Sequence, residues 1–270
     1  MVQDAANFGG SAPEYYDRLL GNAQFKLFGR DLAGRIPQRP GGALLEIACG
    51  TGIVTRALRE RLAPEVPLVA TDISRAMLDY AQARHADLRG VEWKEADATR
   101  LPFGDGAFGA VVCAFGIMFF PDRELGMREA RRVLRKSGRF LFNVWDGLEN
   151  NPHGRANAAV MDELFPGDAE MTFAAMAYGY NDRKAIGAAL QASGFGEVRF
   201  EAVRLPVELP SARDYATGQM RGTPRGMLVE KKGRTIDEVI DKVAAALAKV
   251  GGERPFRVQA QALVVEATAA

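Results

Sequence analysis

Short apolar runs alternate with amphipathic segments along the first half of the chain. Five of these runs have the length and composition of strands, at 43–48, 67–72, 91–97, 109–115 and 139–145. Helical patterns lie between them, at 53–62, at 75–84 after a capping Ser74, and at 123–134 after a capping Asp122, with a stop at Ser137–Gly138. Strands and helices that alternate with short connections predict an α/β fold, a doubly wound parallel sheet covered on both faces.

The second half of the chain is less regular and predicts the far edge of the same sheet. A helix is expected at 182–195, a strand at 197–205 and a closing strand with alternating apolar positions at 254–269. The segments 146–181 and 206–253 are then insertions. The second of them contains an amphipathic helix within its basic end, at 230–250.

The small residues ACGTG, at 48–52, join the first predicted strand to the first predicted helix. A strand that turns directly into a helix points free backbone N–H groups at a ligand, and Gly50 and Gly52 would let the backbone approach it closely. The dinucleotide fingerprint G-x-G-x-x-G is matched poorly, because Thr55 stands at its third glycine and a start two residues earlier has Ala48 at its head. In a doubly wound sheet, ligands bind at the carboxyl ends of the strands.

Composition and charge exclude several classes of protein. The chain has 270 residues, 47% of them hydrophobic and 26% charged, and a net charge of +1, so no overall field attracts it to nucleic acid or anionic lipid. No basic and apolar leader opens the sequence, and the longest uncharged apolar run, 107–120, is shorter than the ~20 residues of a membrane span. We therefore expect a cytoplasmic protein without a membrane span. Cys49 and Cys113 lie in apolar segments, so buried thiols are expected rather than a disulfide or a metal site.

Four further motifs follow the glycine turn in a fixed order. After LLEIACGTG come ATDISRAML, EADATRLPFGDGAF, AVVCAFGIMFFPD and LRKSGRFLF. With these motifs, residues 43–145 resemble the class I S-adenosylmethionine-dependent methyltransferases, in particular the small-molecule group that includes the ubiquinone/menaquinone methyltransferases. The resemblance implies S-adenosylmethionine as the cofactor. It also implies a Rossmann-like sheet of seven strands, mostly parallel with an antiparallel last strand, in a single methyltransferase domain over 1–270.

The resemblance assigns cofactor-binding roles to residues that end or follow the first four strands. Glu46 would lie near the methionine amino group, and Asp72 would bind the ribose hydroxyls. The other assigned positions are Ala48, Gly50 and Gly52 in the turn, Ile73 and Met77 beside the adenine, Asp97 and Ala98 at its exocyclic amine, and Cys113 to Phe115 at the methionine end. A sulfonium cofactor with an ammonium group tolerates nearby carboxylates, whereas a pyrophosphate does not.

Two positions depart from the family pattern, and several residues have a structural alternative. Ala48 stands where the family often has glycine, a change between small residues that is expected to keep the backbone geometry. Gly109 stands where an aspartate is common, which puts the support of that strand in doubt. Asp72 and Asp97 could instead cap turns, and Met77 could pack in the core.

Methyl transfer is a direct displacement at carbon, so positioning of the nucleophile supplies up to ~7–11 kcal/mol and dedicated catalytic residues are few. A general base would add roughly 10²–10⁴-fold. His85 is expected at the end of a helix, remote from the strand ends, as a packing residue. His153, just after the fifth strand, is the candidate catalytic residue, and Asp146 and Tyr178 are weaker candidates.

The acceptor site is expected to come from the less regular parts of the chain. Residues 1–40 would form an N-terminal helical lid, whose aromatic and amphipathic stretch 14–36 would place Tyr15 or Tyr16 over the cofactor; ordinary helix packing is the alternative. The insertions at 146–181 and 206–253 are rich in Met, Phe and Tyr and would form an apolar pocket for a small organic acceptor.

Three classes of function remain compatible with the sequence. The first is an S-adenosylmethionine-dependent methyltransferase that acts on a small molecule, and the others are a protein that binds this cofactor without catalysis and a nicotinamide-dependent oxidoreductase. A nucleic-acid substrate is not expected, because the fourth strand ends in CAFG rather than in the Asn/Asp-Pro-Pro-aromatic sequence of amino-methylating DNA enzymes. Protein methylation stays open, and the oligomeric state does not follow from the sequence.

Overall fold

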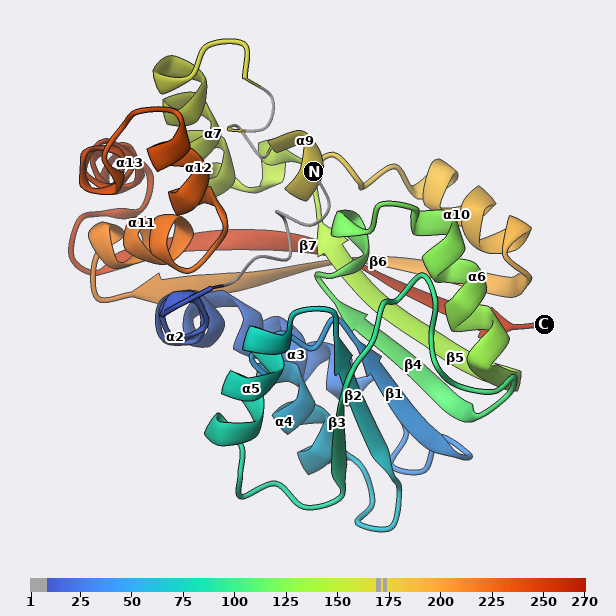
Figure 1. Cartoon of the computed structure of the whole chain (residues 1–270). Helices are drawn as coiled ribbons and strands as arrows, with labels where there is room; N and C mark the ends of the chain where they lie inside the picture. Colours follow the sequence, from blue (N-terminus) through green and yellow to red (C-terminus); the bar gives the residue numbers. More distant parts are fainter. Residues whose placement is uncertain (1–8, 169–170, 172–173) are drawn as a thin grey trace.

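A seven-stranded sheet in the order β3-β2-β1-β4-β5-β7-β6 forms the centre of the computed structural model, which describes residues 9–168, 171 and 174–270 (Figure 1). The strands are β1 (Ala43–Ile47), β2 (Leu68–Asp72), β3 (Val91–Glu95), β4 (Phe108–Ala114), β5 (Leu134–Trp145), β6 (Phe195–Leu209) and β7 (Phe256–Ala269). The first five strands are parallel, and β7 runs antiparallel to both β5 and β6. The predicted Rossmann-like fold with an antiparallel last strand is confirmed.

Helices cover both faces of this sheet, because successive side chains of the buried strands point to opposite sides. Leu44 and Val112 share a buried cluster with Leu58 of α4, whereas Leu45 and Val111 belong to another cluster, with the helices of the opposite face. The first face carries α3 (Lys26–Gly34), α4 (Ile53–Arg61) and α5 (Arg75–Arg84), and the second carries α6 (Arg123–Val133) and α10 (Arg183–Ala192).

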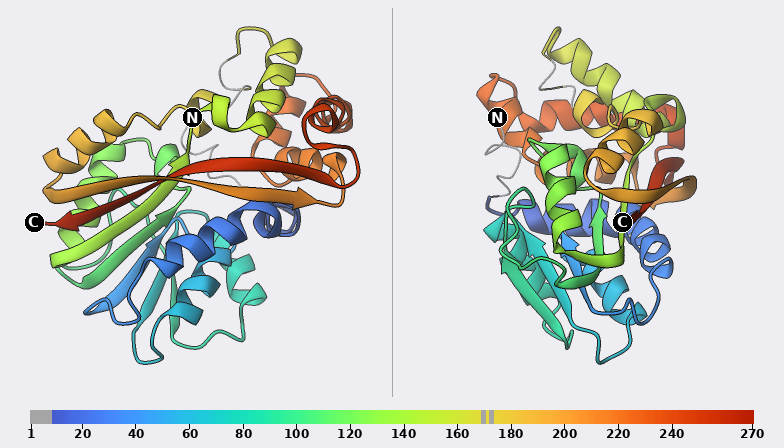
Figure 2. Two further views of the ribbon diagram at one scale, coloured as in Figure 1. Left: turned by 180° about the vertical axis from the view of Figure 1, so that it is seen from behind. Right: turned by 90° about the vertical axis from the view of Figure 1, so that its right-hand side faces the viewer.

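The last two strands extend beyond the rest of the sheet and carry a helical cap. β6 pairs with β7 along its whole length, whereas β5 stops pairing at Ala262 of β7. The remaining part of this antiparallel strand pair packs against helices from both predicted insertions, as the left view of Figure 2 shows. These helices are α7 (Pro152–Leu164), α9 (Ala174–Ala177), α11 (Ala212–Arg221), α12 (Arg225–Lys231) and α13 (Ile236–Gly251).

The N-terminal helices connect the cap to the sheet. α2 (Ala12–Tyr15), the π-helix η1 (Tyr16–Phe25) and α3 follow one another without a break, in agreement with the helical stretch predicted at 14–36. η1 packs against α11 of the cap and against α4 beside the sheet. Residues 1–8 of the predicted lid, and 169–170 and 172–173 of the first predicted insertion, lie outside the described residues. Two short 3₁₀ turns, η2 (Ile117–Phe119) and η3 (Leu148–Asn150), follow β4 and β5.

The predicted end of the third helix at Ser137–Gly138 is wrong. α6 ends at Val133, and Leu134 already pairs with Phe108 of β4. The pairing shifts register before it resumes at Arg139, so the Ser137–Gly138 dipeptide lies in an irregularity of β5, with Ser137 at φ +60°. Its turn-forming residues therefore bend a strand instead of ending a helix.

Gly109 supports its strand through a close approach of the backbone. A Cβ atom at this position would lie 2.5 Å from the carbonyl oxygen of Pro40 and 2.8 Å from the backbone nitrogen of Gly42. No side chain fits there without a shift of the backbone, so glycine suits this position of the strand.

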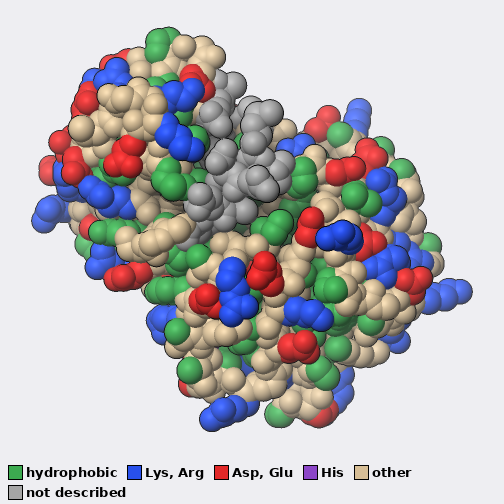
Figure 3. Space-filling model, viewed as in Figure 1, with side chains coloured by type: hydrophobic (Ala, Val, Ile, Leu, Met, Phe, Trp, Pro, Cys, Tyr) green, Lys and Arg blue, Asp and Glu red, His purple; other side chains and the backbone are tan. Residues whose placement is uncertain are grey.

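The molecular surface agrees with the near-zero net charge. Lys and Arg side chains alternate with Asp and Glu over the face that Figure 3 shows, and no large area of one sign is visible on it. Within the described part of the chain, no helix combines the length and the apolar character that crossing a membrane requires.

Candidate functional site

A cavity of about 240 Å³ lies where the carboxyl ends of β1 to β5 face the helical cap. Twelve of the residues predicted from the sequence line it: Tyr16, Ala48, Gly50, Asp72, Ile73, Met77, Asp97, Ala98, Ala114, Phe115, His153 and Tyr178. Glu46 lines a smaller pocket that shares its walls at Ala48, Gly50 and Phe115. The fold thus brings together residues that lie more than a hundred positions apart in the sequence.

The turn after β1 takes the left-handed backbone conformation at three positions. Ala48 has φ +56°, Gly50 has φ +55° and Gly52 has φ +80°. The space in front of Gly50 is open, since a Cβ atom there would meet nothing within 4 Å. At Gly52 a Cβ atom would lie 2.7 Å from the His85 ring and 2.8 Å from Trp93. Gly52 therefore permits packing behind the turn and is not part of the cavity wall.

The expectation that His85 is remote from the strand ends is wrong. Its buried ring lies against the turn, with Nε2 3.1 Å from the carbonyl oxygen of Thr51 and Nδ1 3.2 Å from Nε of Arg56. Because Arg56 can only donate, Nδ1 accepts and Nε2 carries the proton that binds Thr51. Burial and the charge of Arg56 both lower the pKa of His85, so the neutral ring supports the turn from behind.

The Asp72 carboxylate holds the turn in place from the end of β2. Oδ2 accepts a hydrogen bond from the backbone N–H of Gly50 at 2.8 Å, and Oδ1 accepts one from Ser74 at 2.8 Å. Burial nevertheless raises the pKa of Asp72, against the effect of these donors. Asp72 therefore both caps the turn, as in the structural alternative, and lines the cavity. Asp97 similarly caps Thr99 through Oδ1, at 2.8 Å from its backbone nitrogen and 2.7 Å from its hydroxyl.

Glu46 is a buried carboxyl group beneath the turn. Its side chain is 1% exposed, and Oε2 has no hydrogen-bond partner. Burial raises the pKa of Glu46 to about 8. An unpaired buried acceptor of this kind is costly unless a ligand supplies a donor, and the charged form of Glu46 would be stabilised by a cationic one.

Cys113 and Phe115, at the end of β4, face different surroundings. Cys113 is fully buried outside the cavity wall, and burial raises the pKa of its thiol to about 12. Phe115 reaches the cavity with φ +53°, and its N–H donates to Oδ1 of Asn143 on β5 at 2.9 Å. The phenyl ring stacks on Trp145, with the ring centroids 4.2 Å apart.

His153 belongs to the first turn of α7 and not to a loop. The ring is fully buried and lines the cavity, and among the described residues neither Nδ1 nor Nε2 has a hydrogen-bond partner. Burial lowers the pKa of His153 to about 4, so the imidazole is neutral at physiological pH. Tyr178 and Tyr215 lie edge-on to it, with ring centroids at 6.5 Å and 5.6 Å. A neutral, desolvated imidazole in such a wall can accept a proton from a ligand.

Of Tyr178, Asp146 and Tyr15, only Tyr178 lies in the cavity wall. Tyr178 lines the cavity, whereas Asp146 lies outside its wall and accepts hydrogen bonds from the Gly147 N–H and from Nε2 of Gln261. Tyr15 does not line the cavity, and the guanidinium of Arg18 lies over its ring.

Trp145, Asn157 and Arg225 are among the residues of the cavity wall that were not predicted. Trp145 ends β5, so the rule that ligands bind at the carboxyl ends of strands contains the signal for it. Asn157 follows His153 by one helical turn on the same face of α7, and its Oδ1 has no partner. Arg225 is buried in the wall at the start of α12, within the second predicted insertion, and no sequence motif singled it out.

Known proteins resemble the first half of the chain. Residues 45–142 match the family model described as "Methyltransferase domain". The demethylmenaquinone methyltransferase of Deinococcus radiodurans is 42% identical over 100 residues, which make up 37% of this chain and 41% of that protein. The ubiquinone/menaquinone biosynthesis C-methyltransferase UbiE of Pseudomonas savastanoi pv. phaseolicola is 38% identical over 145 residues, 53% of this chain and 56% of that protein. The chain thus spans about half the length of the curated relatives it matches.

A solved structure extends the likeness of the fold to nearly the whole chain. Phosphoethanolamine N-methyltransferase 2 of Haemonchus contortus, in complex with S-adenosyl-L-methionine, aligns with a TM-score of 0.59 over 95% of this chain and 56% of that chain, at 15% identity. The resemblance to S-adenosylmethionine-dependent methyltransferases is confirmed, with the family match confined to 45–142. The matched range 45–142 does not include His153, Asn157 and Arg225.

We predict that Ala48→Gly stabilises the protein. A residue with a Cβ atom is strained at φ +56°, and glycine relieves that strain at the cost of some chain entropy. The free energy of unfolding in urea should rise by roughly 0.5–1 kcal/mol. The matched control is Ala81→Gly in α5, a buried helical position where the same change should destabilise by about 1 kcal/mol or more. A loss of stability in both variants would contradict the strain at Ala48.

Glu46 should make the ligand-free protein less stable as the pH rises. The folded state keeps the Glu46 proton up to about pH 8, whereas the unfolded chain releases it near the ordinary value of 4.5. Between these values the folded state binds more protons, so the free energy of unfolding falls with rising pH, on the order of a few kcal/mol. Urea unfolding across this range should show a smaller decline for Glu46→Gln.

The matched control for Glu46→Gln is Glu124→Gln, because Glu124 is an exposed glutamate on α6. This control should keep the pH dependence of the parent protein. An unchanged decline in Glu46→Gln would show that the carboxyl is already charged in the folded state.

Proposed function

We propose that the protein is an S-adenosylmethionine-dependent methyltransferase that acts on a small organic acceptor. The observation that carries the proposal is the unpaired Oε2 of the buried Glu46, next to the open glycine turn and the Asp72 carboxylate. Asp72 and Asp97 in the cavity wall, with Glu46 in the adjoining pocket, suit a cation with an ammonium group. The matches to methyltransferases over 45–142 support the same conclusion.

The donor set fits each part of this cofactor. Glu46 would accept from the ammonium group, and the open space at Gly50 leaves room for close approach to the backbone. Asp72 would accept from the ribose hydroxyls while it keeps its bonds to the turn, and Asp97 would accept from the adenine amine. Ile73, 49% exposed, offers an apolar surface to the adenine. When bound, the cofactor supplies an electrophilic methyl group on a positively charged sulfur.

The side chains of the cavity would orient the acceptor, exclude water from it and accept its proton. Phe115 and Trp145 are stacked in the cavity wall, where their apolar rings would keep water away from the reacting groups. His153, neutral and without a hydrogen-bond partner, would accept the proton of an acceptor hydroxyl, and Asn157 on the next helical turn would orient that group. The helices of residues 14–36 and the two insertions would close over the acceptor. The relatives named as quinone methyltransferases make hydroquinones and phenols the first acceptors to examine.

A nicotinamide-dependent oxidoreductase is a weaker interpretation for a physical reason. A dinucleotide would bring its pyrophosphate to the turn, where the Glu46 and Asp72 carboxylates would repel it. The fully buried Thr55 also occupies the third glycine position of the fingerprint.

Calorimetric titration with S-adenosylmethionine and S-adenosylhomocysteine tests the cofactor site. The parent protein should bind both, and Asp72→Ala should weaken binding by at least roughly tenfold, because a charged acceptor is lost. Asp79→Ala on the exposed face of α5 is the matched control and should bind normally. Since Asp72 also anchors the turn, the melting temperature of each variant is recorded. A folded parent protein that binds neither compound would refute the proposal.

Replacement of His153 tests the role of the proton acceptor. Formation of S-adenosylhomocysteine is measured across hydroquinones, phenols and aromatic amines. With any hydroxyl acceptor, His153→Gln should lower turnover by roughly 10²–10⁴-fold and leave the affinity for S-adenosylmethionine unchanged. Unchanged turnover would remove His153 from the mechanism. Cofactor binding without turnover on any member of a broad acceptor panel would instead favour a binding protein without catalysis.

A further inference from the structure

The charges in the cavity wall are separated between its two sides. Among the described residues that line it, the acidic ones are Asp72 and Asp97, at the ends of β2 and after β3, and the permanently basic one is Arg225 in the cap. A cationic cofactor on the sheet side would face the acids. The cap side, where the acceptor would lie, presents a cation.

Arg225 is placed inside the protein and not on its surface. The residue begins α12, follows Pro224, and is 5% exposed. Burial lowers the pKa of Arg225 to about 10, against the effect of the Tyr178 and Tyr215 hydroxyls, so the guanidinium is charged at neutral pH. A buried positive charge in the wall of a cavity attracts a ligand of opposite sign more strongly than a charge on the surface does.

The wall around this charge is aromatic. Trp145 stacks against Tyr178 with ring centroids 6.1 Å apart, and His153 lies edge-on to Tyr178 and Tyr215. The Tyr215 hydroxyl donates to Oε1 of Gln24 at 2.9 Å, which fixes its ring. Flat rings around a cation form a site for a planar compound with one charged end.

We propose that the methyl acceptor is an aromatic monoanion whose carboxylate is bound by Arg225. The inference rests on the proposed function and specifies its substrate class. A guanidinium matches a carboxylate in both charge and planar geometry. A phosphate dianion would call for more positive charge than the described cavity wall provides. With the carboxylate at Arg225, the aromatic ring lies among Trp145, Tyr178 and Tyr215, within reach of His153.

The test compares anionic probes with neutral probes of the same shape. The protein is saturated with S-adenosylhomocysteine, and binding of benzoate, benzamide, cinnamate, cinnamamide and phenyl phosphate is measured by calorimetry. In at least one pair the acid should bind roughly tenfold or more tightly than its amide, and more tightly than phenyl phosphate. Arg225→Met should lose this preference, and Arg225→Lys should keep part of it.

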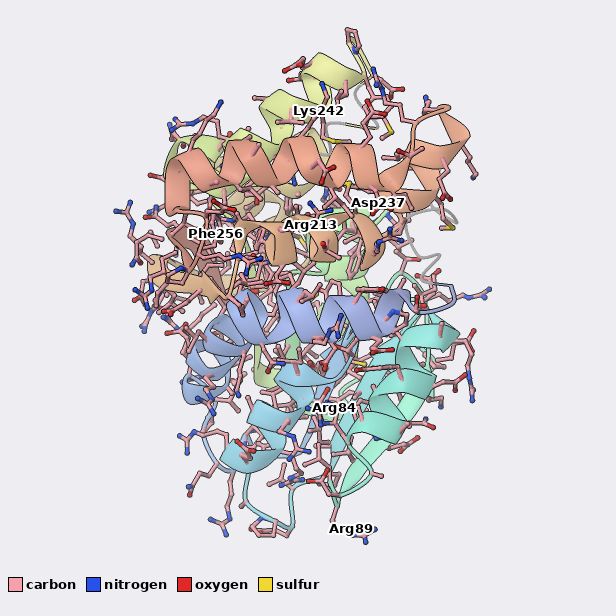
Figure 4. All side chains as sticks on the ribbon, turned by 90° about the vertical axis from the view of Figure 1, so that its left-hand side faces the viewer. Arg84, Arg89, Arg213, Asp237, Lys242 and Phe256 are labelled. Carbon is pink, nitrogen blue, oxygen red and sulfur yellow. The ribbon has the colours of Figure 1, made fainter. Side chains whose placement is uncertain are left out.

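The matched control is Arg213→Met, because Arg213 lies on the outer face of α11, where it pairs with Asp241 (Figure 4). This variant should retain the preference of the parent protein. If both amides bind as tightly as the acids, or neither acid binds, the inference is wrong, whether or not Arg225→Met folds. A preference that survives in a folded Arg225→Met, or tighter binding of phenyl phosphate, also overturns it. Failure to bind S-adenosylhomocysteine counts against the proposed function, and the probes are then measured on the protein alone.

Discussion

The hydrogen bond between the Asp72 carboxylate and the Gly50 N–H joins the ends of β1 and β2 at the floor of the cavity. The other oxygen of the same carboxylate binds the Ser74 N–H at the start of α5, so one side chain holds a turn, a strand end and a helix start. The left-handed turn at Ala48 to Gly52 could not keep its shape without such support, and His85 supplies a second brace from behind. The open surface at Gly50 therefore depends on Asp72 and His85, whose side chains are hydrogen-bonded within the protein.

Other polar groups around the cavity are left unsatisfied. Oε2 of Glu46, both nitrogens of His153 and Oδ1 of Asn157 are buried without hydrogen-bond partners. Most buried polar groups in proteins are paired, and leaving one unpaired costs stability. These atoms line two neighbouring pockets that share Ala48, Gly50 and Phe115 as walls. The distribution indicates a protein that gives up stability in its free state for groups that a ligand satisfies.

The two opposite walls of the cavity come from different parts of the fold. One wall is formed by the cap helices and the other by the strand ends of the sheet. The long antiparallel strands β6 and β7 continue past the end of β5, and α7, α11 and α13 pack against this extension. The turns after β1 to β4 lie at the strand ends of the main sheet. η1 contacts both parts and contributes Tyr16 to the cavity. The cap wall of the cavity thus lies outside residues 45–142, which match the family model, whereas the turns after β1 to β4 lie within them.

The sequence by itself determined the alternating strands and helices, the turn after β1 and the residues at the strand ends, because these depend on periodicity and on spacing along the chain. Asp72 and Asp97 could be placed at one edge of the sheet for that reason. The sequence did not determine which residues form the opposite wall. Asn157 and Arg225 reach the cavity only because the two insertions pack on the same extension of β6 and β7. Glu46 and His85 are buried because segments that are distant in the sequence pack against them. Burial and contact between distant segments are properties of the packed tertiary structure, and no local pattern encodes them.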